Sequence, residues 1–520
     1  MTRALWTILL PVLIPFWSAE PAGQDPAPGL RAYDWLIEGG RIVDGTGSPA
    51  RPADLLLRDG EIAFIGPVDP DTLDVRNRYD ATGAVVAPGF IDLHAHGDPI
   101  QTPGFANFLA MGVTTIALGQ DGSSPQAAAL RSHREAVAQA HPAVNVTHLI
   151  GHNTIRFESG VGHGDPGDSG LARMVGLVET AMDSGARGLS FGLEYDPGAR
   201  ATMDELAALA RPVAARGGVV AAHLRSEDVD RIEQSVDEIL EQGRRSGARV
   251  HISHLKVVLG DDPQQALHVL DRMEEARSEG ISVTGDIYPY TASFTGLAIL
   301  FPEWARPPHH YPTVVRERGE ELRRHLHTRV QARNGPEAML FGSGPWSGRT
   351  LADVARDQGR PYEEILLELG PGGARAAYFV MDEEVMKTFL RNAHVAVASD
   401  GSPGMAHPRG YGTFPRVIRR YVVEEDLLTL EEAIRKMTGL PASILRLDEP
   451  GPESTERPRG LLREGWAADV VVFDPGEMRD RADYTSPHLL AEGVWQVWVA
   501  GQPSWTRGGP LTGARYGRML

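Results

Sequence analysis

The sequence predicts an α/β protein whose centre is an eight-stranded (β/α)8 barrel of the TIM type. Between residues 89 and 445, short apolar runs alternate with helical stretches, a pattern typical of parallel strands joined by helices. Eight runs are plausible strands: 90–94, 113–118, 145–150, 187–191, 218–223, 249–254, 282–286 and 395–399. That number favours a closed barrel over an open sheet.

Helix start signals lie between these runs. Thr202 with Glu205, and Thr429 with Glu432, have the spacing of a capping box ahead of an apolar periodic stretch. The segment from about 291 to 390, between strands seven and eight, is too long for a plain loop. We expect it to form an inserted helical subdomain or lid.

Both ends of the chain have a different sequence pattern from the predicted barrel. Around 35–66, and again at 467–475 and 493–505, apolar and polar residues alternate around glycine and Asp-Gly turns, as in antiparallel hairpins. We therefore expect residues 31–88 and 446–510 to form one composite β domain beside a barrel that spans residues 89–445.

Composition excludes several classes of function. The chain has 520 residues, 42% of them hydrophobic and 23% charged, which is ordinary for a globular protein. Its 69 acidic and 51 basic residues give a net charge of −18, which disfavours nucleic acid as a partner. There is no cysteine, so any metal must be held by histidine and carboxylate side chains.

Residues 1–22 are interpreted as a signal peptide. Arg3 precedes an apolar stretch from Ala4 to Trp17 that is short for a membrane span. We expect a protein exported to the periplasm or secreted, with no stable membrane insertion after signal removal. An uncleaved membrane anchor is the alternative, and the cleavage site stays open because cutting after Ala19 puts the bulky Trp17 at the −3 position.

Polar residues gather where the predicted strands end. These residues are His94 and His96, Asp121, His223, His254, Asp286 with Tyr288, and Asp400. In a parallel barrel the carboxyl ends of all strands meet at one face, where active sites are built. A single histidine is more often packed or solvated, but convergence from so many strands indicates a site.

The spacing of the histidines favours a metal site. His94 and His96 are two residues apart, so both side chains point the same way from an extended strand and can share one ion. His251 lies three residues before His254 and is expected on the opposite face, in a structural role. Asp400 ends an apolar strand, where an unpaired carboxylate would be costly, so we expect it to contact metal or transfer a proton. Its alternative role is a helix N-cap.

The sequence resembles the amidohydrolase superfamily and, more narrowly, the N-acyl-D-amino-acid deacylases (D-aminoacylases), over most of residues 33–505. Superfamily marks are APGFIDLHAHGD (87–98) and RGLLREGWAADVVVFDP (459–475). The stretches typical of the deacylases are GLSFGLEYDPG (188–198), DIYPYTA (286–292) and HPRGYGTFPRV (407–417). The resemblance implies a barrel with a small β-sandwich built from both chain ends, and hydrolysis of the amide bond of a small N-acyl-D-amino acid or D-configured dipeptide.

The resemblance also implies roles for individual residues. His223 and His254 would hold a tightly bound Zn²⁺, with His94 and His96 around a second, weaker metal position. Asp400 would be the catalytic general base and acid. Substrate would be bound by three further residues: Arg409, as the anchor of the α-carboxylate, with Tyr288 beside it, and Tyr195.

One position departs from the family pattern. The usual cysteine ligand after strand two is replaced, and Asp121 stands in its place within Gly119-Gln120-Asp121-Gly122. A carboxylate can ligate or bridge zinc, so Asp121 could keep the role. Alternatively, Glu194 supplies the bridge, a single metal is held by His223 and His254, or the site prefers manganese or another divalent ion.

Two other functions share some of these sequence features. A cyclic amidase of the dihydroorotase or hydantoinase type shares the superfamily marks, but GLSFGLEYDPG offers no lysine at the end of strand four for carbamylation. A catalytically inactive barrel that only binds ligands is disfavoured, because four histidines and Asp400 are all retained. The preferred side chain, the acyl group and the oligomeric state are left open.

Overall fold

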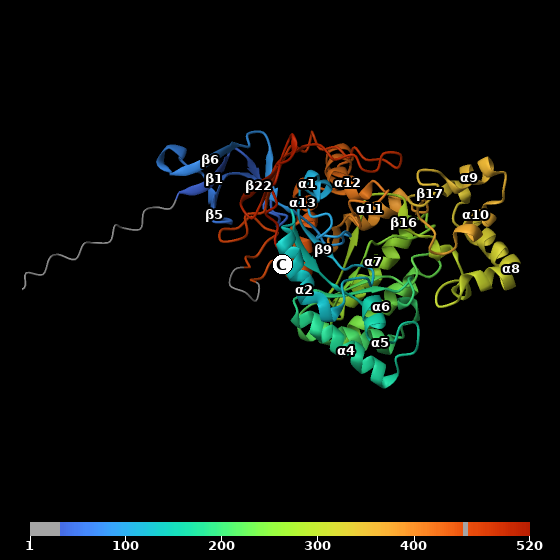
Figure 1. Cartoon of the computed structure of the whole chain (residues 1–520). Coiled ribbons are helices and arrows are strands. Elements are labelled where there is room, and N and C mark those ends of the chain that lie inside the picture. The colour runs from blue at the N-terminus through green and yellow to red at the C-terminus, as the bar shows by residue number, and fades with distance from the viewer. Residues whose placement is uncertain (1–31, 451–455) are drawn as a thin grey trace, which may run out of the picture.

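The computed structural model describes residues 32–450 and 456–520 (Figure 1). The segment interpreted as a signal peptide, residues 1–22, lies outside this range. Within the described range, no helix combines the length and the apolar composition needed to cross a membrane.

The centre of the molecule is the expected parallel barrel, and the predicted fold class is confirmed. Its strands lie within two residues of the predicted runs, because each is an apolar run that is buried on both faces. In order they are β8 (Phe90–Asp92), β9 (Val113–Leu118), β10 (Asn145–His148), β12 (Gly188–Gly192), β13 (Val219–His223), β14 (Arg249–Ile252), β15 (Val283–Ile287) and β19 (Val395–Val397). A short strand, β11 (Ile150–Gly151), continues β10 and pairs with β12.

The barrel closes between its first and last strands. Just beyond β8 and β19, Ala95 pairs in parallel with Gly401. The backbone N–H of His96 donates to the Gly401 carbonyl at 2.8 Å, and the N–H of Asp400 donates to the His94 carbonyl at 2.9 Å. These bonds join segments that are more than 300 residues apart in the chain.

A buried carboxylate reinforces this closure. Asp92 at the end of β8 accepts hydrogen bonds from the Ser399 hydroxyl at 2.5 Å and from the Ser399 N–H at 3.0 Å. Ser399 Oγ in turn accepts the N–H of Gly401 at 2.9 Å. Burial raises the pKa of Asp92 to about 7, against the opposing effect of the Ser399 hydrogen bonds.

Helices cover the outside of the barrel between successive strands (Figure 1). They are α1 (Ala106–Ala110), α2 (Leu130–Ala140), α4 (Gly167–Asp183), α5 (Met203–Ala215), α6 (Ile232–Ser246), α7 (Pro263–Ser278), α11 (Glu383–Arg391), α13 (Leu430–Met437) and α14 (Gly439–Leu445). Helices α5 and α13 start where predicted: the side chains of Thr202 and Thr429 accept the N–H groups of Glu205 and Glu432.

Strands from both chain ends form two sheets beside the barrel. One sheet has the order β5 (Glu61–Gly66), β4 (Asp54–Arg58), β1 (Tyr33–Glu38) and β6 (Val75–Asp80). In the other, β20 (Val470–Phe473) pairs with β7 (Val85–Pro88), and β21 (Val494–Val499) and β22 (Gln502–Thr506) follow. Side chains of both sheets share one core, with Trp498 buried at its centre. The two ends of the described chain therefore depend on each other for burial.

The segment between β15 and β19 forms a separate layer over the barrel mouth. It contains three helices, α8 (Tyr311–Gln331), α9 (Leu351–Gln358) and α10 (Tyr362–Leu369), with an apolar core of their own. The structure adds a three-stranded antiparallel sheet in the order β16 (Ser293–Gly296), β18 (Arg375–Tyr378), β17 (Met339–Phe341). The last helix before β19, α11, packs on α7 and belongs to the barrel.

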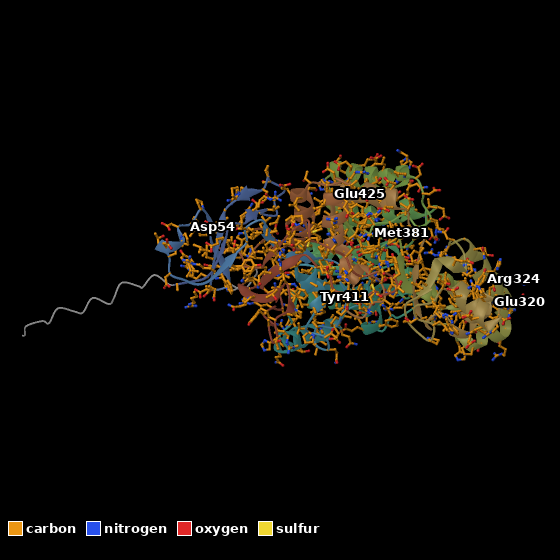
Figure 2. All side chains as sticks on the ribbon, turned by 90° about the horizontal axis from the view of Figure 1, so that it is seen from above. Asp54, Glu320, Arg324, Met381, Tyr411 and Glu425 are labelled. Atoms are coloured by element: carbon orange, nitrogen blue, oxygen red, sulfur yellow. The ribbon has the colours of Figure 1, made fainter. Side chains whose placement is uncertain are left out.

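The inserted layer and the sandwich lie at opposite ends of an elongated molecule. Seen from above, Asp54 of the sandwich and Glu320 of α8 mark these two ends (Figure 2). The inserted layer and the sheet that holds Asp54 therefore lie on different sides of the barrel.

We expect Ser399→Ala to destabilise the closed barrel. The change removes the hydroxyl that donates to Asp92 and accepts from Gly401, and so leaves buried polar groups without partners at a cost of about 1–3 kcal/mol. Urea titration measures the free energy of unfolding. Ser132→Ala, at an exposed helical serine, is the control and should change it by under about 0.5 kcal/mol. Equal stability of both variants would show that this contact does not hold the closure.

Candidate active site

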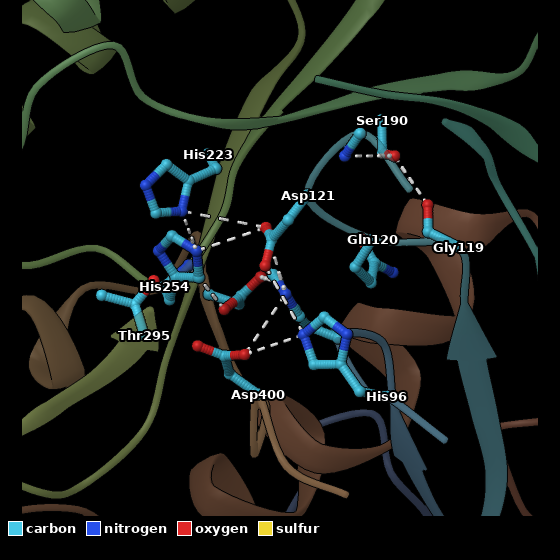
Figure 3. Close-up of polar contacts among 12 residues, drawn as sticks. His96, Gly119, Gln120, Asp121, Ser190, His223, His254, Thr295 and Asp400 are labelled. Carbon is cyan, nitrogen blue, oxygen red and sulfur yellow. Dashed lines mark hydrogen bonds and ion pairs between the residues drawn. The ribbon is translucent and has the colours of Figure 1, made fainter. Parts of the chain in front are cut away.

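A cavity of about 620 Å³ opens at the carboxyl ends of the barrel strands. Its lining includes eight of the nine residues predicted as site residues: His96, Asp121, Tyr195, His223, His254, Tyr288, Asp400 and Arg409. The ninth, His94, is fully buried directly behind this surface. In Figure 3 the side chains of His96, Asp121, His223, His254 and Asp400 point toward one another from separate strands.

Two groups of potential metal ligands share Asp121. In the first, His94, His96, Asp121 and Asp400 bring their ligand atoms within 4.8 Å of one another. His96 Nε2 lies 3.0 Å from Asp400 Oδ1 and 3.5 Å from Asp121 Oδ2. His94 Nε2 lies 3.5 Å from Asp121 Oδ1.

The second group joins Asp121 to the histidines of strands five and six. His223 Nδ1 and His254 Nε2 are 2.8 Å apart, and Asp121 Oδ1 lies 3.4 Å from His254 Nε2 and 3.9 Å from His223 Nδ1. Asp121 therefore faces both groups at once, with one oxygen toward His223 and His254 and the other toward His96.

Three of these residues have an unusual backbone. Asp121, His254 and Asp400 have φ angles of 54°, 39° and 48°. This left-handed region is uncommon for residues other than glycine, although aspartate and histidine tolerate it better than most. Backbone strain of this kind persists only where the surrounding fold holds it, and it clusters at functional sites.

The electrostatics of the cluster favour a cation. Burial acts against charge on His94, but the carboxylates of Asp121 and Asp400 outweigh it and raise the pKa of His94 well above its usual value. Burial likewise acts to raise the pKa of Asp400, yet Arg409 and His94 hold that pKa below its ordinary value. Two ionised carboxylates facing buried imidazoles create a negative potential that a divalent ion would neutralise.

The donor set fits such an ion. Both ring nitrogens of His94, and Asp121 Oδ1, are buried without a hydrogen-bond partner. Buried polar atoms normally find partners, and leaving them unpaired costs free energy. Imidazole nitrogens and carboxylate oxygens are ligands that Zn²⁺ accepts. The residues present therefore suit a metal, and no thiolate is needed.

Asp286, behind the cluster, supports several of these ligands. Its Oδ1 accepts the backbone N–H of His254 at 2.8 Å, and its Oδ2 lies 2.8 Å from His251 Nε2 and 3.6 Å from His94 Nδ1. His251 also contacts Thr284 Oγ1 at 2.8 Å. His251 is in register with Ala221, on the same strand face as His223, and it shares Asp286 Oδ2 with His94. The prediction that it lies on the opposite face from the ligands was therefore wrong.

Glu194 occupies a different place from Asp121. Its Oε2 lies 3.1 Å from His223 Nε2, the ring nitrogen that faces away from Asp121. Glu194 belongs to a third possible ligand group, with His223 and Glu227, which contains neither Asp121 nor His254. Its position suits orienting His223 better than bridging two ions within the groups that contain Asp121.

Two charged residues of the site were missed by sequence reasoning. Lys256 Nζ lies 2.6 Å from Glu227 Oε1, and this oxygen lies 3.0 Å from His254 Nδ1. Both residues are buried. The sequence contained a signal for both residues. Lys256 lies two residues after His254, which is the same spacing as between His94 and His96, and Glu227 ends the stretch AHLRSE (222–227) that contains His223.

Arg409 and Tyr288 lie together at the edge of the cluster. Arg409 Nη2 is 2.9 Å from Asp400 Oδ2, and the guanidinium lies over the Tyr288 ring at 4.6 Å from its centre. Arg409 Nε is buried without a hydrogen-bond partner. Tyr195 lies on the other side, with its ring 4.5 Å from the His223 ring and its hydroxyl 3.1 Å from Thr295 Oγ1.

Comparison with known proteins agrees with this geometry. Residues 327–504 match the model described as "Amidohydrolase family". The chain is 35% identical to an N-acyl-D-glutamate deacylase of Alcaligenes xylosoxydans xylosoxydans, over 90% of this chain and 93% of that protein. It is 33% identical to a D-aminoacylase of the same organism, over 94% and 97% of the two chains.

A solved structure is similar over the same extent. The N-acyl-D-glutamate deacylase from Bordetella bronchiseptica, complexed with zinc and a phosphonate inhibitor, superimposes with a TM-score of 0.80 at 33% identity and covers 94% of this chain and 100% of its own. A barrel of this kind, with histidines and carboxylates at its strand ends, defines an amidohydrolase. More narrowly, the chain belongs to the N-acyl-D-amino-acid deacylase (D-aminoacylase) family.

We expect Asp286→Asn to weaken metal binding. The amide cannot provide the charge that holds His251 and orients His94, and loss of such an outer partner typically lowers metal affinity 10- to 100-fold. Competition with a chromophoric chelator measures the dissociation constant of Zn²⁺. Asp237→Asn, at an exposed aspartate of α6, is the control. Wild-type affinity in Asp286→Asn would remove Asp286 from the support of the site.

Proposed function

We propose that this protein is a metal-dependent hydrolase that cleaves the linear amide bond of N-acyl-D-amino acids, or of D-configured dipeptides, to a carboxylate and a free D-amino acid. The observation that carries the proposal is the pair of ligand groups that share Asp121 directly beside Asp400 and Arg409. The substrates named for its relatives support the choice of D-amino acids.

His223, His254 and Asp121 would hold the essential metal, with His94, His96 and Asp121 around a second position. When bound, a divalent ion such as Zn²⁺ polarises the scissile carbonyl and lowers the pKa of a water molecule to about 7. Oxygen ligands make manganese or another divalent ion a second candidate. The tighter position is assigned to His223 and His254 by family resemblance.

Asp400 would move the proton. As the oxygen of water bonds to the carbonyl carbon, Asp400 accepts a proton from that water, and it delivers the proton to the nitrogen when the C–N bond breaks. Its carboxylate suits this role because Arg409 and His96 hold it in place at 2.9 Å and 3.0 Å. Because Arg409 and His94 keep its pKa low, Asp400 starts the reaction ionised.

Arg409 and Tyr288 would receive the α-carboxylate of the substrate. A guanidinium binds carboxylates bidentately, and Arg409 Nε has no partner inside the protein. Arg375 also lines the cavity, whereas Lys256 and Arg333 are paired with Glu227 and Asp228 of the same lining. Tyr195 faces the opposite edge of the cluster, where its hydroxyl could contact the substrate beside His223.

We expect zinc-loaded protein to hydrolyse N-acetyl-D-amino acids in preference to their L-enantiomers. A panel of N-acetyl D- and L-amino acids, including glutamate, aspartate and leucine, measures kcat/KM. Asp400→Asn should lower kcat by about 10²–10⁴, because the amide cannot accept the proton. Its metal content should match the wild type. Turnover restricted to hydantoins or dihydroorotate would favour the cyclic amidase, and no turnover of any amide would favour an inactive binding protein.

Metal analysis of variants distinguishes whether Asp121 or Glu194 is the ligand shared by the two metal positions. Asp121→Ala removes the residue that the two ligand groups share, so we expect less than one tightly bound metal per chain by elemental analysis and loss of most activity. Asp121→Cys should retain a tightly bound zinc, since a thiolate is a good zinc ligand. Glu194→Gln loses only a partner that orients His223, so its metal content should fall less than that of Asp121→Ala. Full metal and activity in Asp121→Ala would remove Asp121 from the site.

Export of the protein is proposed from residues 1–22 of the sequence. Amino-terminal sequencing of the protein recovered from the periplasm or the medium checks it, and a mature protein that begins at Met1 would contradict cleavage.

A further inference from the structure

Phe157 is an exposed aromatic residue on the rim of the catalytic cavity. It lies on α3 (His152–Glu158), lines the cavity, and its side chain is 57% exposed. This is the largest exposed fraction among the large hydrophobic side chains in the described part of the chain. A single exposed hydrophobic side chain is common on protein surfaces, but a substrate bound in the adjoining cavity could cover this ring and gain free energy from the apolar area it buries.

The helix that carries Phe157 is firmly held. On its buried side, Arg156 Nη1 lies 2.6 Å from both carboxylate oxygens of Glu205, and His152 Nε2 lies 2.7 Å from one of them. Nearer the cavity, Thr154 Oγ1 donates to the Ser124 carbonyl and accepts the Ser124 N–H. These bonds fix α3 on several sides, so the ring of Phe157 is presented at the rim by a rigid element.

The loop after α3 is fixed around the same ring. Arg156 Nε donates to the Gly162 carbonyl at 2.9 Å, and His163 stands edge-on to Phe157 with 5.6 Å between ring centres. The rim at this point therefore offers a preformed apolar surface that borders the catalytic cavity.

The charges of the cavity divide it into two walls. Its cationic residues are Lys256, Arg333, Arg375 and Arg409, which come from segments after strands six and eight and from the insertion after strand seven. Glu227, Asp228 and Asp400 pair with Lys256, Arg333 and Arg409 in turn. Arg333 and Arg409 each also have a buried nitrogen, Nε, without a hydrogen-bond partner in the described structure, and of these two only Arg409 pairs with a residue of the ligand groups. Strands one to three contribute His96, Gly97, Gln120, Asp121, Ser123, Asn153, Thr154 and Phe157, and this described part of the lining includes no lysine or arginine. Strand three lies across the barrel from strand seven, so the two walls face each other over the metal ligands.

From this division we infer that the wall around Phe157 binds the acyl half of the substrate, and that the enzyme favours extended apolar acyl groups over acetyl. The inference rests on the proposed function, which puts a carboxylate-bearing amino acid on one side of the scissile bond. Arg409 would anchor that anionic half, so the uncharged acyl half would point across the ligand groups toward strands one to three. An acyl chain longer than acetyl would then reach Phe157 and cover its exposed ring.

The test is a chain-length series on the metal-loaded full-length protein. The N-acetyl, N-butanoyl, N-hexanoyl and N-octanoyl derivatives of the D-amino acid with the highest turnover are compared by kcat/KM. In the wild type we expect a rise of about two- to fourfold for each methylene that covers the ring. In Phe157→Ala the rise should be largely lost, so that the deficit relative to wild type grows with chain length.

A matched control and a second variant separate the outcomes. Phe64→Ala removes another exposed phenylalanine, on β5 of the sandwich, and should keep the wild-type chain-length dependence. Phe157→Leu keeps apolar surface and should retain part of the rise. A wild-type protein that turns over N-acetyl compounds without any gain from longer acyl groups, or equal slopes in Phe157→Ala, would overturn the inference. Failure to hydrolyse any N-acyl-D-amino acid would instead overturn the proposed function.

Discussion

The pairing between the first and last barrel strands is the contact on which the site depends. Ala95 pairs with Gly401 there. On either side of this pair, the N–H of His96 donates to the Gly401 carbonyl and the N–H of Asp400 donates to the His94 carbonyl. Without this closure the two histidines of strand one and the aspartate of strand eight would lie on opposite edges of an open sheet. The buried Asp92 contributes a second link, because its carboxylate is satisfied by Ser399 on the other strand. The hydrogen bonds that close the fold are therefore the same ones that assemble the ligand groups.

The site gathers buried carboxylates whose charges must be compensated by neighbouring groups. The pKa values of Asp121 and Asp400 are lowered although both side chains are largely buried. Arg409 compensates by an ion pair with Asp400, and the pKa values of His94, His96 and His254 are raised in turn. A divalent ion would replace the protons on the histidines. The substitution of cysteine by Asp121 fits this picture, since a carboxylate has two oxygens and faces both ligand groups. The resulting set of potential metal ligands contains only nitrogen and oxygen donors.

The insertion between strands seven and eight gives the cavity its asymmetry. It brings Arg333 and Arg375 over the barrel mouth, on the side where Lys256 and Arg409 already stand. The wall made by strands one to three carries Phe157 instead. With its anionic end anchored by Arg409, as proposed, an elongated substrate would lie across the cavity with its scissile bond over the potential metal ligands. Specificity for each half of the substrate would then come from a different part of the chain.

The amino-acid sequence by itself determined the barrel, its eight strands and the residues at their ends. This was possible because buried parallel strands are continuous apolar runs, and because a closed barrel must bring their carboxyl ends to one face. For His251 the spacing to His254 gave the wrong face, because the left-handed backbone of His254 breaks the alternation of the strand. The sequence could not decide which oxygen or nitrogen each ligand residue turns toward the centre of the site. That orientation depends in part on the left-handed backbone of Asp121, His254 and Asp400, which spacing does not reveal.

Only the tertiary structure revealed the partners that come from distant or irregular segments. Glu194 was a candidate bridge by sequence, yet it faces the outer nitrogen of His223. Lys256 and Glu227 form their ion pair across neighbouring strands, and Arg375 reaches the cavity from a sheet that the sequence did not predict. Periodicity and spacing report which face of an element a residue occupies. Contacts between elements depend on how the chain packs, and that is decided by the whole fold.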